Sequence, residues 1–164
     1  MTSKRLSYEA GHTAKFLVVV DDTPECDRAI YFATRRCARI GARVLLCRVI
    51  ATKERNQQWL GVADIMRQEA HDEALTVLAQ AAARASNIAG ITPEQVIREG
   101  ETAQEIRALI EEDMDIAILI LAAGIGKEGP GPLVTELGKN FGTFPIPIAI
   151  VPGQLSDQDL DALS

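Results

Sequence analysis

The sequence contains no apolar run that approaches the roughly 20 residues needed to span a bilayer. No apolar segment follows its polar first residues, Met1 to Arg5. Basic residues are also in deficit, with 17 lysines and arginines against 23 aspartates and glutamates and a formal net charge of −6. This charge disfavours attraction to nucleic acid backbones and to anionic membranes. We therefore expect a cytoplasmic protein that binds neither a membrane nor a nucleic acid.

Side chains that commonly hold metals or perform hydrolysis are scarce or badly placed. The two histidines, His12 and His71, have no partner at the close spacing of a metal site. The cysteines lack Cys-x-x-Cys spacing and fall inside apolar periodic segments, which indicates reduced, buried thiols at Cys26, Cys37 and Cys47. No serine has the strand-turn-helix setting of a Gly-x-Ser-x-Gly nucleophile. The sequence thus predicts no catalytic residue and no metal ligand.

A length of 164 residues with 47% hydrophobic content is typical of one independently stable domain. Residues 1–14 are polar and aperiodic, and we expect a disordered N-terminal arm there. The domain itself is expected over residues 15–152. Residues 153–164 form an acidic C-terminal tail that also contains leucines. Both a flexible segment and a short docking helix remain open for this tail.

Apolar runs alternate with amphipathic segments along the domain. The runs predict β-strands over residues 16–20, 44–50, 95–98, 116–121 and 148–151, with the polar third strand at a sheet edge. Helices are expected between them, starting after Thr23, near Val62, at Thr102 with its capping box, and near Thr135. Such alternation gives right-handed crossovers. The predicted fold class is α/β, a single open five-stranded parallel sheet with helices on both faces.

A glycine-rich segment follows the fourth predicted strand and contains Gly124, Gly126 and Gly129. Glycines let backbone N–H groups approach a phosphate closely, and a following helix adds its positive end. In open α/β sheets ligands bind outside the carboxyl ends of strands, where the winding direction reverses. Asp21 closes the first strand, so the two loops meet if the first and fourth strands are neighbours. Nucleotide binding is therefore the first hypothesis.

Three parts of the sequence resemble the universal stress protein family: the strand and turn over 15–23, the turn over 98–103, and the ending over 145–152. Their order and spacing carry the resemblance, which extends over residues 15–152. The resemblance implies a sheet of the adenine nucleotide α-hydrolase-like type. It also implies a homodimer formed through the last strand, Ile146 to Val151, and ATP binding in some members but not in others.

The resemblance further implies which residues would contact a nucleotide. An aspartate that closes the first strand contacts adenosine in ATP-binding members, and it corresponds to Asp21. A hydrophobic residue that ends the second strand contacts adenine and corresponds to Val49. Thr23 joins this group as a candidate, although the sequence favours capping of the first helix as its role.

The phosphates of ATP, bound with Mg, would lie on the glycine-rich loop. The matching segment lies around Gly124 and includes Gly126 and Gly129 as candidate contacts. Thr135 is a further candidate, since its hydroxyl can contact an anion while it caps the last helix. Lys127 in the same loop could neutralise phosphate or remain solvated beside Glu128.

This loop departs from the pattern of the ATP-binding members, which is glycine, two residues, glycine, nine residues, then glycine with serine or threonine. Alignment on the proline-rich ending places Leu121 and Val134 where two of these glycines stand. A register on the local glycines fails too, because Lys139 takes the last glycine position. Pro130 and Pro132 remove two backbone donors from the phosphate cradle.

Asp22 stands where the family usually has a glycine after the first-strand aspartate, and it adds negative charge beside an incoming triphosphate. The leading hypothesis is a non-enzymatic stress-response or regulatory protein that acts as a homodimer with weak or absent ATP binding. One alternative is an ATP-binding, nucleotide-dependent switch that uses the local glycines and Thr135. The second is a weak ATP-hydrolysing enzyme.

Overall fold

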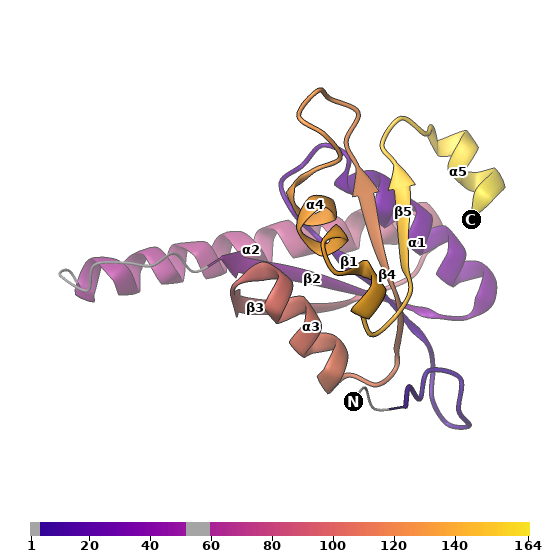
Figure 1. The fold of residues 1–164 in the computed structure, drawn as a ribbon, viewed down its shortest axis with the longest axis horizontal. Helices are drawn as coiled ribbons and strands as arrows, with labels where there is room; N and C mark the ends of the chain where they lie inside the picture. The colour runs from indigo at the N-terminus through magenta and orange to yellow at the C-terminus, as the bar shows by residue number, and fades with distance from the viewer. Residues whose placement is uncertain (1–3, 52–59) are drawn as a thin grey trace.

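The computed structural model describes residues 4–51 and 60–164 and has a five-stranded parallel sheet at its centre (Figure 1). The strands are β1 (Lys15–Val19), β2 (Arg43–Ala51), β3 (Glu94–Gly100), β4 (Ile116–Ala123) and β5 (Ile148–Pro152). Their order in the sheet is β3-β2-β1-β4-β5, so β1 is central and β3 is at an edge, as predicted. The predicted α/β fold class is confirmed.

Helices cover both faces of this sheet (Figure 1). One face carries α1 (Cys26–Ile40), α2 (Leu60–Ala89) and α5 (Asp157–Leu163), whose buried side chains share one core cluster. The other face carries α3 (Thr102–Glu112) and α4 (Pro132–Gly138), and α4 is followed by the short 3-10 helix η1 (Phe141–Thr143). None of the helices in the described ranges is long and apolar enough to cross a bilayer.

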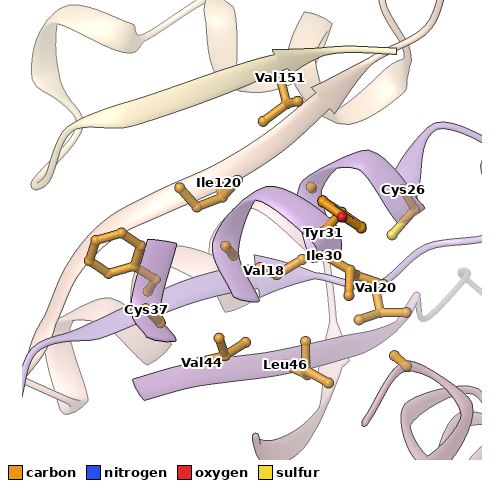
Figure 2. Packing of buried hydrophobic residues seen from close by; sticks show 14 of the residues in the cluster. Val18, Val20, Cys26, Ile30, Tyr31, Cys37, Val44, Leu46, Ile120 and Val151 are labelled. Carbon is orange, nitrogen blue, oxygen red and sulfur yellow. The ribbon is translucent and has the colours of Figure 1, made fainter. Parts of the chain in front are cut away.

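Side chains of β1 alternate between two hydrophobic cores, which explains the continuous apolar sequence of this strand. Phe16 and Val18 belong to the core under α1 and α2, whereas Leu17 and Val19 belong to the core under α3 and α4. Figure 2 shows Val18 beneath α1, among side chains of the neighbouring strands. Because both faces of the strand are buried, every position along it favours an apolar residue.

The three cysteines are free and buried, as the sequence predicted. They belong to α1 and β2 and lie in the two cores as Cys26, Cys37 and Cys47. Burial raises the pKa of each thiol to about 12. The thiols are therefore neutral near pH 7 and pack as small apolar groups.

The predicted disordered arm is wrong for residues 4–14, which pack against the turn before β4. The Leu6 N–H donates a hydrogen bond to the Met114 carbonyl at 2.9 Å, and the Arg5 Nη2 donates to the Asp113 carbonyl at 2.5 Å. The Asp113 carbonyl also accepts a hydrogen bond from the Ile116 N–H at 3.2 Å, so Arg5 is its second donor. These contacts depend on a distant part of the chain, so local composition could not indicate them.

The acidic tail forms a docking helix, one of the two possibilities that the sequence left open. Ser156 begins a capping box, because its Oγ accepts a hydrogen bond from the Asp159 N–H at 3.1 Å and its N–H donates to the Asp159 carboxylate at 3.0 Å. Leu160 of α5 is fully buried in the core shared with α1. The tail is thus part of the folded unit.

The capping box predicted at Thr102 is wrong, because the residue before it caps α3. The Glu101 carboxylate accepts hydrogen bonds from the N–H groups of Ala103 at 3.3 Å and Gln104 at 2.9 Å. A carboxylate also interacts favourably with the positive end of a helix. This charged acceptor takes the place that the threonine hydroxyl was expected to fill.

Candidate functional site

The winding direction of the sheet reverses between β1 and β4, which are neighbours as the site hypothesis required. Their register pairs Phe16 with Ile118 and Val18 with Ile120. The loops that follow these two strands therefore leave the same edge of the sheet side by side. This is the place where open α/β sheets bind ligands.

Two hollows lie at this edge. The smaller one, about 20 Å³, lies between the β1–α1 loop and the start of α4, and its walls include Asp21, Thr23 and Glu25. The larger one, about 360 Å³, lies on the β2 side and is lined by Asp21 and Val49 among others. Small-molecule sites commonly measure roughly 300 to 1,000 Å³. The larger hollow can therefore hold a small molecule, and Asp21 borders both.

The turn after β1 holds Asp21 in place. Its Oδ1 accepts one hydrogen bond from the Thr23 N–H at 3.0 Å and one from the Thr23 hydroxyl at 2.5 Å. Both of these hydrogen bonds end on Oδ1. The Oδ2 atom therefore keeps acceptor capacity for a ligand hydroxyl. Thr23 thus orients Asp21 and does not cap α1, whose N-cap position is Glu25. The predicted capping role of Thr23 is wrong for this reason.

An arginine that the sequence analysis missed stands beside Val49. The Arg48 Nη1 donates a hydrogen bond to the Val20 carbonyl at 3.1 Å, and its Nη2 lies 3.0 Å from the Asp22 carboxylate. Its side chain is only 14% exposed, and the pairing offsets the cost of its desolvation. The sequence did carry a sign of this arginine, since Arg48 is a charged residue inside the apolar run of β2. Since Asp22 already neutralises Arg48, the nearby cation does little to attract an anion.

Backbone N–H groups of the glycine loop donate hydrogen bonds to carbonyls of the same loop. The Gly124 N–H donates to the Pro130 carbonyl at 2.9 Å, and the Gly129 N–H donates to the Gly126 carbonyl at 3.3 Å. Gly129 adopts a φ of 97°, which side-chain-bearing residues rarely adopt, so a glycine is required to make this turn. The glycines therefore shape a self-bonded loop, and two of the amides expected to bind phosphate already have partners.

The carboxylate of Glu25 lies against this loop. A Cβ added to Gly124 would come within 2.7 Å of the Glu25 Oε1, and one added to Gly131 would lie 4.0 Å from the same oxygen. The Glu25 side chain makes no capping hydrogen bond to α1. An anionic group of the protein itself therefore lies beside Gly124 and Gly131, where the glycine loop begins and ends. Nothing local distinguishes a glutamate at the start of a helix, so Glu25 could not be predicted as part of the site from the sequence.

Acidic groups surround the two hollows. The β1–α1 loop carries Asp21, Asp22 and Glu25, and the opposite wall of the larger hollow carries Glu101 and Glu136. No group of three or more His, Cys, Asp or Glu side chains is placed to hold a metal ion in the part of the chain that the structure describes. The local charge thus disfavours a triphosphate.

The predicted site residues divide into two groups. Three of them line the hollows: Asp21, Thr23 and Val49. The other four line neither hollow: Gly124, Gly126, Gly129 and Thr135. Thr135 is exposed on α4, and its N–H donates to the Gly131 carbonyl at 3.1 Å within the chain. The half of the site predicted for adenosine therefore has a cleft. In the half predicted for phosphates, two loop amides already donate hydrogen bonds to carbonyls of the same loop.

A sequence model of the universal stress protein family matches residues 13–127, which include β1 to β4 and the first part of the glycine loop. The chain belongs to this family. No curated protein sequence matches this universal stress protein significantly. Solved structures nevertheless resemble it over most of its length.

UspA from Lactobacillus plantarum is 14% identical, with a TM-score of 0.71 over 84% of this chain and 97% of that chain. The universal stress protein from Archaeoglobus fulgidus in complex with dAMP is 16% identical, with a TM-score of 0.61 over 84% of this chain and 97% of its own. A family member from Arabidopsis thaliana with AMP bound is 18% identical, with a TM-score of 0.59 over 88% and 94%. At such identities the likeness shows the shared fold.

Proposed function

We propose that this universal stress protein acts without catalysis, as a homodimeric stress-response or regulatory protein with weak or absent ATP binding. The observation that carries the proposal is the Glu25 carboxylate, which lies against Gly124 and near Gly131 of the glycine loop. A triphosphate on this loop would have to displace Glu25 or accept a carboxylate as its neighbour. Either course weakens binding.

Two further features support the same conclusion. Two unit charges of like sign repel each other by roughly 4 kcal/mol at 4 Å and an effective dielectric constant near 20, and solvent screening lowers this figure at an exposed loop. The loop amides of Gly124 and Gly129 already donate hydrogen bonds within the loop. A phosphate would therefore meet repulsion and gain few new hydrogen bonds.

A nucleotide-dependent switch is the second candidate, and the larger hollow favours it. Asp21 and Val49 line this hollow of about 360 Å³, and structurally similar family members have AMP or dAMP bound. A nucleoside with one phosphate would place less negative charge near Glu25 than ATP does. Parallel titrations with adenosine, AMP and Mg-ATP separate the two candidates, because only the switch requires tight Mg-ATP binding.

An ATP-hydrolysing activity is the third candidate. Hydrolysis needs a positioned water, a base and stabilisation of the phosphate charge. At this site carboxylates lie against the loop, the loop itself carries Lys127 beside Glu128, and the Arg48 guanidinium is paired with Asp22. Phosphate release from Mg-ATP by the purified chain, compared with a Glu25→Gly variant and a protein-free control, measures this activity. Release above the control by the unmodified chain would favour an enzyme.

Nucleotide retention tests the weak-binding proposal without added ligand. The purified chain is denatured, and the released small molecules are separated and measured by absorbance at an adenine band. We expect clearly less than one adenine nucleotide per chain, because a weakly held ligand dissociates during purification. Near-stoichiometric ATP in the extract would contradict the proposal and favour the switch.

The homodimer is proposed to form through β5, an edge strand whose outer side has no strand partner in the described sheet. Ile150 of this strand is 40% exposed, and an open apolar edge is a template for pairing. We expect Ile150→Lys to weaken dimerisation at least about tenfold in sedimentation equilibrium. Ile65→Lys is the matched control, since Ile65 is 61% exposed on α2. A monomeric unmodified chain at micromolar concentration would contradict this interface.

A further inference from the structure

Four arginines gather on the outer side of α1 and α2, although the chain is acidic overall. Arg28, Arg35 and Arg39 lie on one side of α1, seven and eleven residues apart from the first, and Arg84 of α2 lies next to Arg28 through their shared contact with Asp27. We call Arg28, Arg35, Arg39 and Arg84, together with Tyr31, the arginine surface.

Tyr31 is the centre of the arginine surface. The guanidinium carbons of three arginines lie close to its ring centroid: Arg28 at 5.5 Å, Arg35 at 5.6 Å and Arg84 at 5.5 Å. Cations at this distance are attracted to the face of an aromatic ring. The ring thus helps to hold several positive charges close together. Asp27 pairs with both Arg28 and Arg84 and offsets part of this charge, but four guanidinium groups beside one carboxylate still favour an anionic partner.

Helix α5 covers this surface with a set of acidic groups. Asp157 lies 2.7 Å from the Arg28 Nη2, and Asp161 lies 2.9 Å from the Arg35 Nε. The Tyr31 hydroxyl donates a hydrogen bond to the Asp161 carboxylate at 2.7 Å. Backbone carbonyls of the tail accept further bonds, from Arg28 to Leu155 at 3.0 Å and from Arg39 to Asp161 at 2.7 Å.

Apolar anchoring accompanies these charges. Leu160 lies between Asp157 and Asp161 in sequence and is fully buried in the core cluster that contains Tyr31. The recognised pattern is therefore Asp-x-x-Leu-Asp on one side of a helix, in which two carboxylates meet arginines and one leucine enters the core. A general polyanion such as nucleic acid has no counterpart of this leucine.

The attachment of α5 has the properties of an exchangeable contact. The helix has seven residues, too few to be stable on its own in water. Its acidic groups remain accessible, with Asp157 55% and Asp161 44% exposed, and such ion pairs each contribute little. What favours α5 is its tether to β5 through the short segment 153–156, which gives a high local concentration.

We propose that the arginine surface is a binding site for an acidic helical segment of a partner protein with the pattern Asp-x-x-Leu-Asp, and that α5 is its intramolecular occupant. A partner segment binds when α5 leaves, so α5 sets a threshold for binding. The site lies on the α1 and α2 face of the sheet and does not depend on nucleotide binding at the β1 and β4 loops.

The test uses the full chain carrying Asp157→Lys, Leu160→Asp and Asp161→Lys, which we call the released variant, and a fluorescent peptide with the sequence of residues 153–164. Fluorescence anisotropy should show binding to the released variant at least about tenfold tighter than to the unmodified chain, with affinity falling as salt rises. A scrambled peptide of the same composition should not bind. Equal binding by the unmodified chain, or no binding preference over the scrambled peptide, would overturn the proposal.

Two controls locate the peptide on the surface. Adding Arg28→Glu and Arg35→Glu to the released variant should abolish peptide binding, whereas adding Arg43→Glu and Arg67→Glu, which lie outside the arginine surface, should not. Loss of binding in both cases, or binding of single-stranded nucleic acid as tightly as the peptide, means a general anion patch and overturns the proposal. Circular dichroism of each variant confirms that the fold is retained.

Hydrogen exchange on the unmodified chain keeps the proposal testable even if the released variant does not fold. At millimolar peptide, a concentration comparable to that of a short tether, the amides of α5 should exchange faster by at least about twofold. Amides of the central strand β1 should not change. Unaltered exchange in α5 at saturating peptide would show that α5 is a fixed part of the fold and would overturn the proposal.

Discussion

Replacing Glu25 with glycine is expected to raise the affinity for Mg-ATP by at least about tenfold, or ~1.4 kcal/mol. The substitution removes the carboxylate that lies against Gly124 and frees the space beside this glycine. Glycine is acceptable there because Glu25 is the N-cap residue of α1 and makes no side-chain capping bond. The gain is well below the full repulsion of two close charges because solvent screens this loop. Isothermal titration calorimetry measures it.

Two controls separate the charge of Glu25 from its bulk. Glu25→Gln keeps most of the side-chain volume and should recover part of the gain if charge dominates. Glu111→Gln makes the same change in net charge at an exposed position near the end of α3, and it should leave the affinity unchanged. An unaltered affinity in a correctly folded Glu25→Gly variant would show that the self-bonded loop amides, and not Glu25, limit binding.

Leu119→Ala is expected to lower the free energy of unfolding by about 2 to 5 kcal/mol, measured by urea denaturation. Leu119 is fully buried in β4, where it pairs with Leu17 on one side and Ile148 on the other. A cavity at this central position cannot close without moving several strands. The large loss follows from that rigidity.

Leu160→Ala is the matched variant, because Leu160 is also fully buried. Its effect on global unfolding should be smaller than that of Leu119→Ala, since α5 can detach while the sheet stays folded, and the free energy of docking limits the loss. The main consequence should be faster hydrogen exchange in α5. Equal losses for both leucines would show that α5 unfolds only with the whole domain, and would also weaken the proposal of an exchangeable helix.

Features that rest on the apolar pattern were predictable from the sequence, whereas the helix caps expected at Thr23 and Thr102 were wrong. Continuous apolar runs indicated buried parallel strands, since a strand covered on both faces needs an apolar residue at every position. Alternation with helices predicted the parallel sheet. The sequence brought Asp21 and the Gly124 loop together only on the condition that β1 and β4 are neighbours, and the structure meets this condition. The cysteines were correctly predicted to be buried because they fall on the apolar stripe of a helix or strand.

Features that rest on contacts between distant segments were not predictable. Arg5 fixes the N-terminal residues by reaching carbonyls more than a hundred positions away. Glu25 approaches Gly124 only because β1 and β4 are adjacent. The sequence left the tail open as flexible or helical, because its leucines stabilise a helix only where α1 supplies an apolar surface for Leu160. In each case composition allowed the contact, but only the fold decides whether the partner is present.

The central claim is that a loop with a carboxylate beside it and with its own amides already hydrogen-bonded prevents tight triphosphate binding. Calorimetric titration of the unmodified chain with Mg-ATP tests this claim most directly. The account predicts a dissociation constant in the millimolar range or weaker, corresponding to about −4 kcal/mol or less favourable. A saturable isotherm with a micromolar dissociation constant, about −8 kcal/mol, would contradict it.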